Sequence, residues 1–154
     1  MRKSLIVSSL LVAGLGASLA VAGDNWVGSW KLNASKSTPS TSGLRVDSLK
    51  FEATAAGIKL TSDGTDAQGK ATHASYTSKF DGKEVPWTGN PMADTAAPKK
   101  VDDNSYVNAW KLAGKGTVTA KVVVSGDGKT LTVTQDGTDA QGGKVHSVTV
   151  YDRQ

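Results

Sequence analysis

The chain has 154 residues, with 18 basic and 14 acidic side chains and no cysteine. A formal charge of only +4 is small for a protein that neutralises many phosphates, so the composition argues against a nucleic-acid partner. Without cysteine the chain has no disulfide bond and no thiol nucleophile, and its stability must come from packing and strand pairing.

Residues 1–22 have the pattern of a signal peptide. Arg2 and Lys3 precede an apolar stretch from residue 5 to residue 22, which ends in the small residues Ala20-Val21-Ala22 that a signal peptidase accepts. An uncleaved anchor is the alternative, because a stretch of about 18 residues can just span a bilayer. Cleavage would leave residues 23–154 as one domain, secreted or periplasmic, without stable insertion in the membrane.

The first predicted strand, residues 26–33, has an unusual set of side chains on one parity. Trp26, Gly28, Trp30 and Leu32 would all point the same way in an extended chain. A glycine between two tryptophans lets a ring or another backbone approach closely, as a strand that plugs one end of a barrel requires.

From residue 23 onward, short alternating apolar and polar runs are separated by Gly, Asp and Asn, which is typical of antiparallel β-structure. The predicted strands are residues 26–33, 45–54, 57–62, 70–80, 83–88, 94–101, 105–112, 116–125, 129–135 and 144–152. Asp-Gly pairs at 81–82 and 127–128 fit the tight turns of hairpins. We therefore predict an all-β, up-and-down antiparallel barrel of about eight to ten strands, because closure removes exposed edges. A β-sandwich is the alternative.

One segment occurs twice in the chain. Residues 58–76 align without gaps on residues 131–149, and both copies contain Asp-Gly-Thr-Asp-Ala-Gln-Gly followed by a histidine, His73 or His146. Both copies are predicted to form a strand, a polar loop and a second strand. The aspartates of the two copies are Asp63, Asp66, Asp136 and Asp139. They offer oxygen donors, but calcium loops normally carry more carboxylates, so the repeated use of one turn is the preferred interpretation. We predict no metal and no cofactor.

No catalytic set is recognisable, and we expect that the protein is not an enzyme. His73 and His146 are the two histidines available as bases, and each lies in a predicted strand without a nucleophile elbow nearby. A histidine in such a place is typically an exposed side chain. An enzyme would need one of them to line a cleft beside a carboxylate.

Aromatic residues are the remaining candidates for a site. Trp87, Tyr106, Trp110 and Tyr151 lie in several predicted strands, and Asn108 shares the parity of Tyr106 and Trp110. These rings either line an apolar cavity, in which a few polar groups orient a ligand, or fill a small core.

The sequence Trp-Val-Gly-Ser-Trp-Lys-Leu-Asn at 26–33 and the final strand resemble the first and last strands of the calycins, the lipocalins and fatty-acid-binding proteins. The resemblance implies a small secreted bacterial lipocalin-like barrel. It also implies a structural plug made of Gly28, Trp30 and Arg153, with Arg153 stacked on Trp30 in a cation–π contact.

The resemblance also implies which side of the last strand faces inward. It places Thr149 and Tyr151 inside, whereas simple hydrophobic alternation would place Val148 and Val150 there. Two features depart from the fatty-acid-binding branch. Residues 34–43 are too short and too polar for its helical lid, and Thr149 stands where that branch has an arginine for the ligand carboxylate.

We predict an exported, non-catalytic protein that binds a small apolar or amphiphilic molecule, such as a lipid, inside the barrel. The candidate ligand-binding residues are Trp87, Tyr106, Asn108, Trp110, Thr149 and Tyr151. The alternative is a secreted protein-interaction or inhibitor barrel with a filled core and an exposed apolar patch on its loops. A structural role without a defined ligand is a further possibility.

Overall fold

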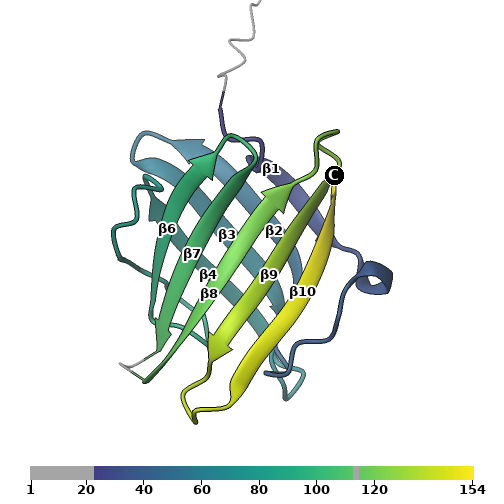
Figure 1. Cartoon of the computed structure of the whole chain (residues 1–154), viewed down its shortest axis with the longest axis vertical. Coiled ribbons are helices and arrows are strands. Elements are labelled where there is room, and N and C mark those ends of the chain that lie inside the picture. Colours follow the sequence, from purple (N-terminus) through teal and green to yellow (C-terminus); the bar gives the residue numbers. More distant parts are fainter. Residues whose placement is uncertain (1–22, 113–114) are drawn as a thin grey trace, which may run out of the picture.

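In the computed structural model, residues 23–112 and 115–154 are described, and they form an antiparallel β-barrel (Figure 1). The predicted signal peptide lies outside the described residues. The strands are β1 (Gly28–Leu32), β2 (Arg45–Thr54), β3 (Gly57–Thr65), β4 (Ala71–Ser78), β5 (Val85–Pro86), β6 (Thr95–Asp102), β7 (Ser105–Leu112), β8 (Lys115–Val124), β9 (Thr130–Thr138) and β10 (Lys144–Arg153). A short 3-10 helix, η1 (Ala34–Lys36), follows β1. All ten predicted strands are present, with shifts at their ends.

The strands form an up-and-down meander in which consecutive strands pair, except β4 and β5, which are the two edges of the sheet. In addition, β1 pairs with β10, where Trp30 lies opposite Arg153. The second seam, between β4 and β5, is short: the backbones of Ser75 and Thr88 exchange hydrogen bonds of 2.9 and 3.0 Å. The barrel is therefore nearly closed, and the predicted fold class is confirmed.

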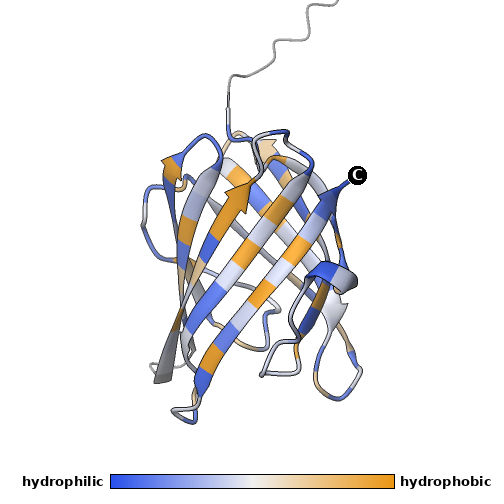
Figure 2. Ribbon diagram, turned by 45° about the vertical axis from the view of Figure 1, so that its right-hand side comes forward, coloured by the Kyte–Doolittle hydropathy of each residue, from blue (hydrophilic) through white to orange (hydrophobic). Residues whose placement is uncertain are grey.

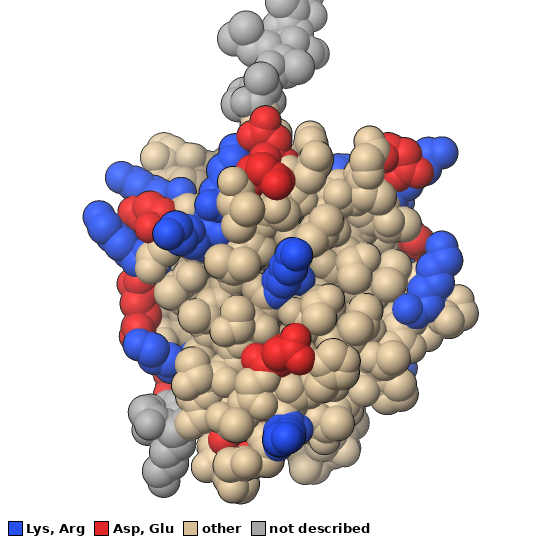
Figure 3. All heavy atoms as spheres, viewed as in Figure 1, with Lys and Arg blue, Asp and Glu red and all other residues tan. Residues whose placement is uncertain are grey.

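Alternation along the strands separates the inside of the barrel from the outside. In β8, the inward side chains are Val118, Ala120, Val122 and Val124, all buried, and the residues between them are exposed. Figure 2 shows the same alternation of apolar and polar residues along the strands. On the face shown in Figure 3, Lys and Arg side chains are interspersed with Asp and Glu. Within the described part of the chain, no helix has the length and apolar character that crossing a bilayer requires.

The loops after even-numbered strands and the two ends of the described chain form the closed end of the barrel. Trp26 is fully buried there, with its ring 5.1 Å from that of Tyr106 and 5.7 Å from that of Phe80. Its expected place in the first strand is wrong: Trp26 belongs to a turn, closed by a 3.0 Å hydrogen bond from Val27 N to Asp24 O, and β1 begins two residues later. These aromatic rings pack the interior at this end of the barrel.

The expected plug of this end is present. The guanidinium of Arg153 lies 4.1 Å from the centre of the buried Trp30 ring, as the resemblance implied. Its nitrogens donate hydrogen bonds to the carbonyl oxygens of Asn25, Val27 and Gly128. Gly28 leaves room for it, because a Cβ at that position would lie 2.7 Å from Arg153 Nη1. One side chain thus connects the segment before β1 with the β8–β9 turn and the last strand.

The two copies of the repeat form the hairpins β3–β4 and β9–β10. Each copy has a glycine where the backbone of the neighbouring strand comes close. A Cβ at Gly64 would lie 2.0 Å from Arg45 O, and one at Gly137 would lie 2.1 Å from Thr117 O. The repeated glycines are therefore needed for strand contact on the outer sides of the two hairpins.

Candidate functional site

A cavity of about 110 Å³ occupies the open end of the barrel, which is the end formed by the loops after odd-numbered strands. Its rim includes Ser40 and Ser42 from the β1–β2 connection, Asn90 and Met92 from the β5–β6 loop, and Asp139 from the β9–β10 turn. Tyr106 lies both in the aromatic cluster of the closed end and in the cavity lining, so it separates the packed half of the barrel from the hollow half.

All six residues predicted to bind a ligand line this cavity. They are Trp87, which directly follows β5, Tyr106, Asn108 and Trp110 on β7, and Thr149 and Tyr151 on β10. The register of the barrel brings these three regions of the chain together. All six residues lie at the cavity wall, but some of their polar groups already make hydrogen bonds within the protein.

Asn108 and Tyr151 already use their polar groups to hold the barrel. Asn108 Oδ1 accepts a 3.0 Å hydrogen bond from the backbone N–H of Ala97, and its Nδ2 lies 3.5 Å from the hydroxyl of Tyr76. The hydroxyl of Tyr151 donates to Val46 O at 3.3 Å, beside an irregularity in the β2–β3 pairing. These contacts give both side chains a structural role.

The tyrosines that line the cavity are neutral at ordinary pH. Burial raises the pKa of Tyr106 well above the usual value of a phenol, and the neighbouring Tyr76 raises it further. Burial, together with the negative charge of Asp47, also raises the pKa of Tyr151. Both hydroxyls therefore act as uncharged polar groups.

The tryptophans form one wall of the cavity. Trp87 and Trp110 meet edge to face, with ring centres 5.1 Å apart and an interplanar angle of 88°. Both indole N–H groups are buried and have no hydrogen-bond acceptor among the described residues. The buried indole of Trp26 at the closed end shares this property, so it does not by itself mark the cavity.

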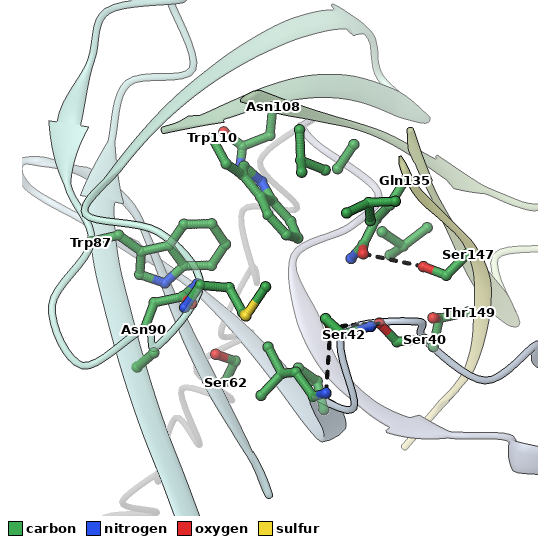
Figure 4. Close-up of a pocket in the computed structure, with 18 of the residues that line it drawn as sticks. Ser40, Ser42, Ser62, Trp87, Asn90, Asn108, Trp110, Gln135, Ser147 and Thr149 are labelled. Atoms are coloured by element: carbon green, nitrogen blue, oxygen red, sulfur yellow. Dashed lines mark hydrogen bonds between the residues drawn. The ribbon is translucent and has the colours of Figure 1, made fainter. Parts of the chain in front are cut away.

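The opposite wall carries hydroxyl and amide groups (Figure 4). Gln135 on β9 accepts a 3.1 Å hydrogen bond from the hydroxyl of Ser147 on β10, and Thr149 lies one inward position further along. Gln135 Nε2 has no partner among the described residues. Gln135 and Ser147 were not predicted as site residues from the sequence.

The repeat contains a signal that could have found them. The copies are identical in the loop and at the histidine, but differ at every pair of aligned positions that line the cavity. These pairs are Leu60 with Val133, Ser62 with Gln135, Thr72 with Val145, and Ala74 with Ser147. Two hairpins with the same repeated sequence thus present different side chains to the interior.

The last strand faces inward with the parity that the resemblance implied. Thr149 and Tyr151 line the cavity, while Val148 and Val150 point to the other side. The segment of residues 37–44, here called the strap, covers the outer edge of β10 at this point. Thr38 Oγ1 accepts a 2.8 Å hydrogen bond from Val148 N, and Ser37 Oγ accepts one of 2.9 Å from Val150 N.

A second pocket of about 290 Å³ lies beneath the strap. It shares Ser40, Leu44, Val46 and Thr149 with the cavity, so the two spaces adjoin each other between β2 and β10. Because β1 ends at Leu32, no strand fills the sheet between β2 and β10 at this level. The strap closes that gap through the hydroxyls of Ser37 and Thr38 and through the backbone N–H of Thr38, which donates to Val148 O at 2.8 Å.

The two histidines of the repeat and their aspartate partners do not line the cavity. His73 Nδ1 lies 2.6 Å from Asp63 Oδ1, and His146 Nδ1 lies 2.6 Å from Asp136 Oδ1, and all four side chains are exposed. The remaining aspartates cap the turns: Asp66 Oδ1, for example, accepts hydrogen bonds from two backbone N–H groups of its own loop. Over residues 23–112 and 115–154, no group of three or more potential metal ligands converges.

In comparisons with known proteins, this sequence matches no protein-family model and no curated protein sequence.

Proposed function

We propose that this protein is an exported, non-catalytic binding protein that holds a small apolar or amphiphilic molecule in the cavity at the open end. One observation supports the proposal. Aromatic rings pack one half of the barrel interior, whereas the other half contains a mainly apolar cavity with loops at its rim. Such concave sites with a few polar groups are where proteins bind small molecules. Both histidines of the chain lie on the outer surface and not in the lining of the cavity.

The size of the cavity limits its occupant. About 110 Å³ is below the roughly 300 Å³ at which pockets for drug-sized molecules begin, and close to the roughly 150 Å³ of an apolar cavity that can hold benzene. We therefore propose that the cavity alone holds a compact molecule, since a long acyl chain would also have to occupy the adjoining pocket of about 290 Å³ beneath the strap. This narrows the expectation of a lipid carrier that the sequence analysis raised.

The proposal includes export of the protein and its relation to the calycins. A nearly closed ten-stranded meander with an Arg153–Trp30 stack is compatible with a calycin barrel, and the pattern of residues 1–22 is compatible with a signal peptide. Protein recovered from the periplasm or medium of its own host should begin at Gly23. A mature protein that still contains residues 1–22 would contradict export by cleavage.

The alternative is an interaction or inhibitor barrel, which the packed closed end favours. Such a barrel should also present an apolar patch. Among the described residues, the large hydrophobic side chains that are exposed are Val101 and Val123, on β6 and β8, which are separated by β7. This surface offers little apolar area to a partner, so ligand binding is the function that we favour.

A pair of adjacent substitutions on β8 tests the binding function. Ala120→Leu places a larger side chain in the cavity, whereas Thr119→Leu places the same side chain on the outer surface. Native mass spectrometry of protein from its own host should reveal a non-covalent additional mass in wild type and in Thr119→Leu, and not in Ala120→Leu. An identical spectrum for all three proteins, with no additional mass, would contradict the proposed function.

A further inference from the structure

The lining of the cavity carries no positive charge among the described residues. Of these residues none is Lys, Arg or His, and the one carboxylate is that of Asp139 at the rim. Asp139 Oδ1 is already engaged, since it accepts hydrogen bonds of 2.9 Å from Gln141 N and 2.7 Å from Gly143 N. A carboxylate or phosphate on a ligand would lose its hydration in the cavity without gaining a cationic partner, which is costly.

The cavity has two unlike walls that face each other. Trp87 and Trp110 form an aromatic wall, and Gln135, Ser147 and Thr149 form a polar one (Figure 4). Aromatic side chains favour contact with a flat ring, through its face or its edge. Hydroxyl and amide groups on the other side favour a molecule whose opposite edge is polar.

Polar groups on the walls have capacity for further hydrogen bonds. Gln135 Nε2 is an unused donor, and the hydroxyl of Ser62, which is buried and lines the cavity, makes no hydrogen bond within the described chain. The indole N–H groups of the aromatic wall are donors without acceptors. Buried donors such as these two indole groups are normally satisfied by protein, water or ligand.

We propose that the occupant of the cavity is an uncharged molecule with a single flat ring and a hydroxyl or carbonyl group on its edge. The ring contacts Trp87 and Trp110, and the polar group binds at Gln135 and Ser147. This inference rests on the proposed function and adds the chemical class of the ligand. It excludes carboxylates and phosphates as well as purely apolar rings as the best occupants.

Three probes that share one ring test the class: benzyl alcohol, toluene and benzoate. The indole N–H signals of the protein's four tryptophans can be followed by NMR of the ¹⁵N-labelled protein. Trp87 and Trp110 line the cavity, whereas Trp26 and Trp30 lie at the closed end and serve as internal controls. Benzyl alcohol should shift the first pair and leave the second pair in place. It should bind about fivefold more tightly than toluene, which is the value of one net hydrogen bond, and at least about tenfold more tightly than benzoate.

A variant of the polar wall tests the assigned position. Gln135→Met keeps the approximate volume but removes the amide, so the fivefold preference for benzyl alcohol over toluene should fall, with Ser147 as the remaining polar partner. Thr134→Val, on the outer face of the same strand, should preserve the fivefold difference. A benzyl alcohol preference that persists undiminished in Gln135→Met would overturn the assignment.

The outcomes separate this inference from the proposed function. If benzoate binds as tightly as benzyl alcohol and shifts Trp87 or Trp110, the inferred ligand class is wrong but the cavity is a binding site. If none of the three probes shifts the indole signal of Trp87 or Trp110, and if Ala120→Leu gives the same native mass spectrum as wild type, the proposed function itself is wrong.

Discussion

Arg153 offers the sharpest test of how the closed end of the barrel is held. We expect Arg153→Ala to lower the free energy of unfolding by about 2–3 kcal/mol. The side chain donates hydrogen bonds to three backbone carbonyls, each worth about 1 kcal/mol, and its contact with Trp30 at 4.1 Å adds about 0.5–1 kcal/mol at an exposed site. The expected loss is below the sum because Arg153 is exposed, and water will replace part of these interactions.

The assay is urea unfolding at neutral pH and fixed salt, followed by tryptophan fluorescence and circular dichroism. The only other arginine outside residues 1–22 provides the control. Arg45 is exposed and pairs with Asp47 at 2.7 Å on the same strand, so Arg45→Ala should cost less than about 0.5 kcal/mol. Equal losses for the two variants, or a loss below 0.5 kcal/mol for Arg153→Ala, would refute the reasoning.

Gly28 should be energetically coupled to Arg153. In wild type, Gly28→Ala places a Cβ 2.7 Å from the guanidinium, at a φ of +135° that an L-residue rarely adopts. In the Arg153→Ala background the clash disappears and the backbone strain remains. The cost of Gly28→Ala should therefore fall by about 1 kcal/mol in the double-mutant cycle. Additive effects would show that the glycine serves only the backbone conformation.

Three further outcomes follow from the packing. Burial raises the pKa of all three tyrosines, so the stability that their neutral hydroxyls give the fold is complete below about pH 10 and is lost as the pH rises further. The absorbance of tyrosinate should therefore stay flat to about pH 10. It should then rise in one step with unfolding, not as a gradual titration. Gly64→Ala should cost at least about 2 kcal/mol in urea unfolding because its Cβ meets a backbone oxygen, whereas Gly126→Ala, which meets nothing within 4 Å, should be nearly neutral. Replacing Ser37 by Ala and Thr38 by Val should loosen the strap, and should speed amide hydrogen exchange in β10 at residues 148 and 150 while leaving exchange in β8 unchanged.

Most of the fold could be predicted because the signals are local. Alternation of apolar and polar residues in β8 and Asp-Gly turns such as that at 127–128 specify strands and hairpins wherever they occur. The start of the first strand was wrong because the turn that holds Trp26 depends on one backbone hydrogen bond between Asp24 and Val27. No residue pattern reports such a contact.

The site could be predicted in position but less well in chemistry. The six candidates all line the cavity. For β10 the inward parity followed from the calycin resemblance, because hydrophobic alternation alone would have placed Val148 and Val150 inside. The commitment of Asn108 to Ala97 could not be foreseen, since it depends on the register between β6 and β7. Gln135 and Ser147 were missed because a polar residue in a strand is normally assigned to the outer face. Only the closed barrel shows that both side chains point inward.

The pairing of β1 with β10 has a consequence for folding kinetics. Every other long strand pairing joins neighbours along the chain, so hairpins can form early with short loops. Closure by β1 and β10 joins residues such as Trp30 and Arg153, which are more than a hundred positions apart, and it carries the largest loop entropy. One edge of β1 therefore stays unpaired until β10 has been synthesised, and the barrel closes into a cooperative unit only then.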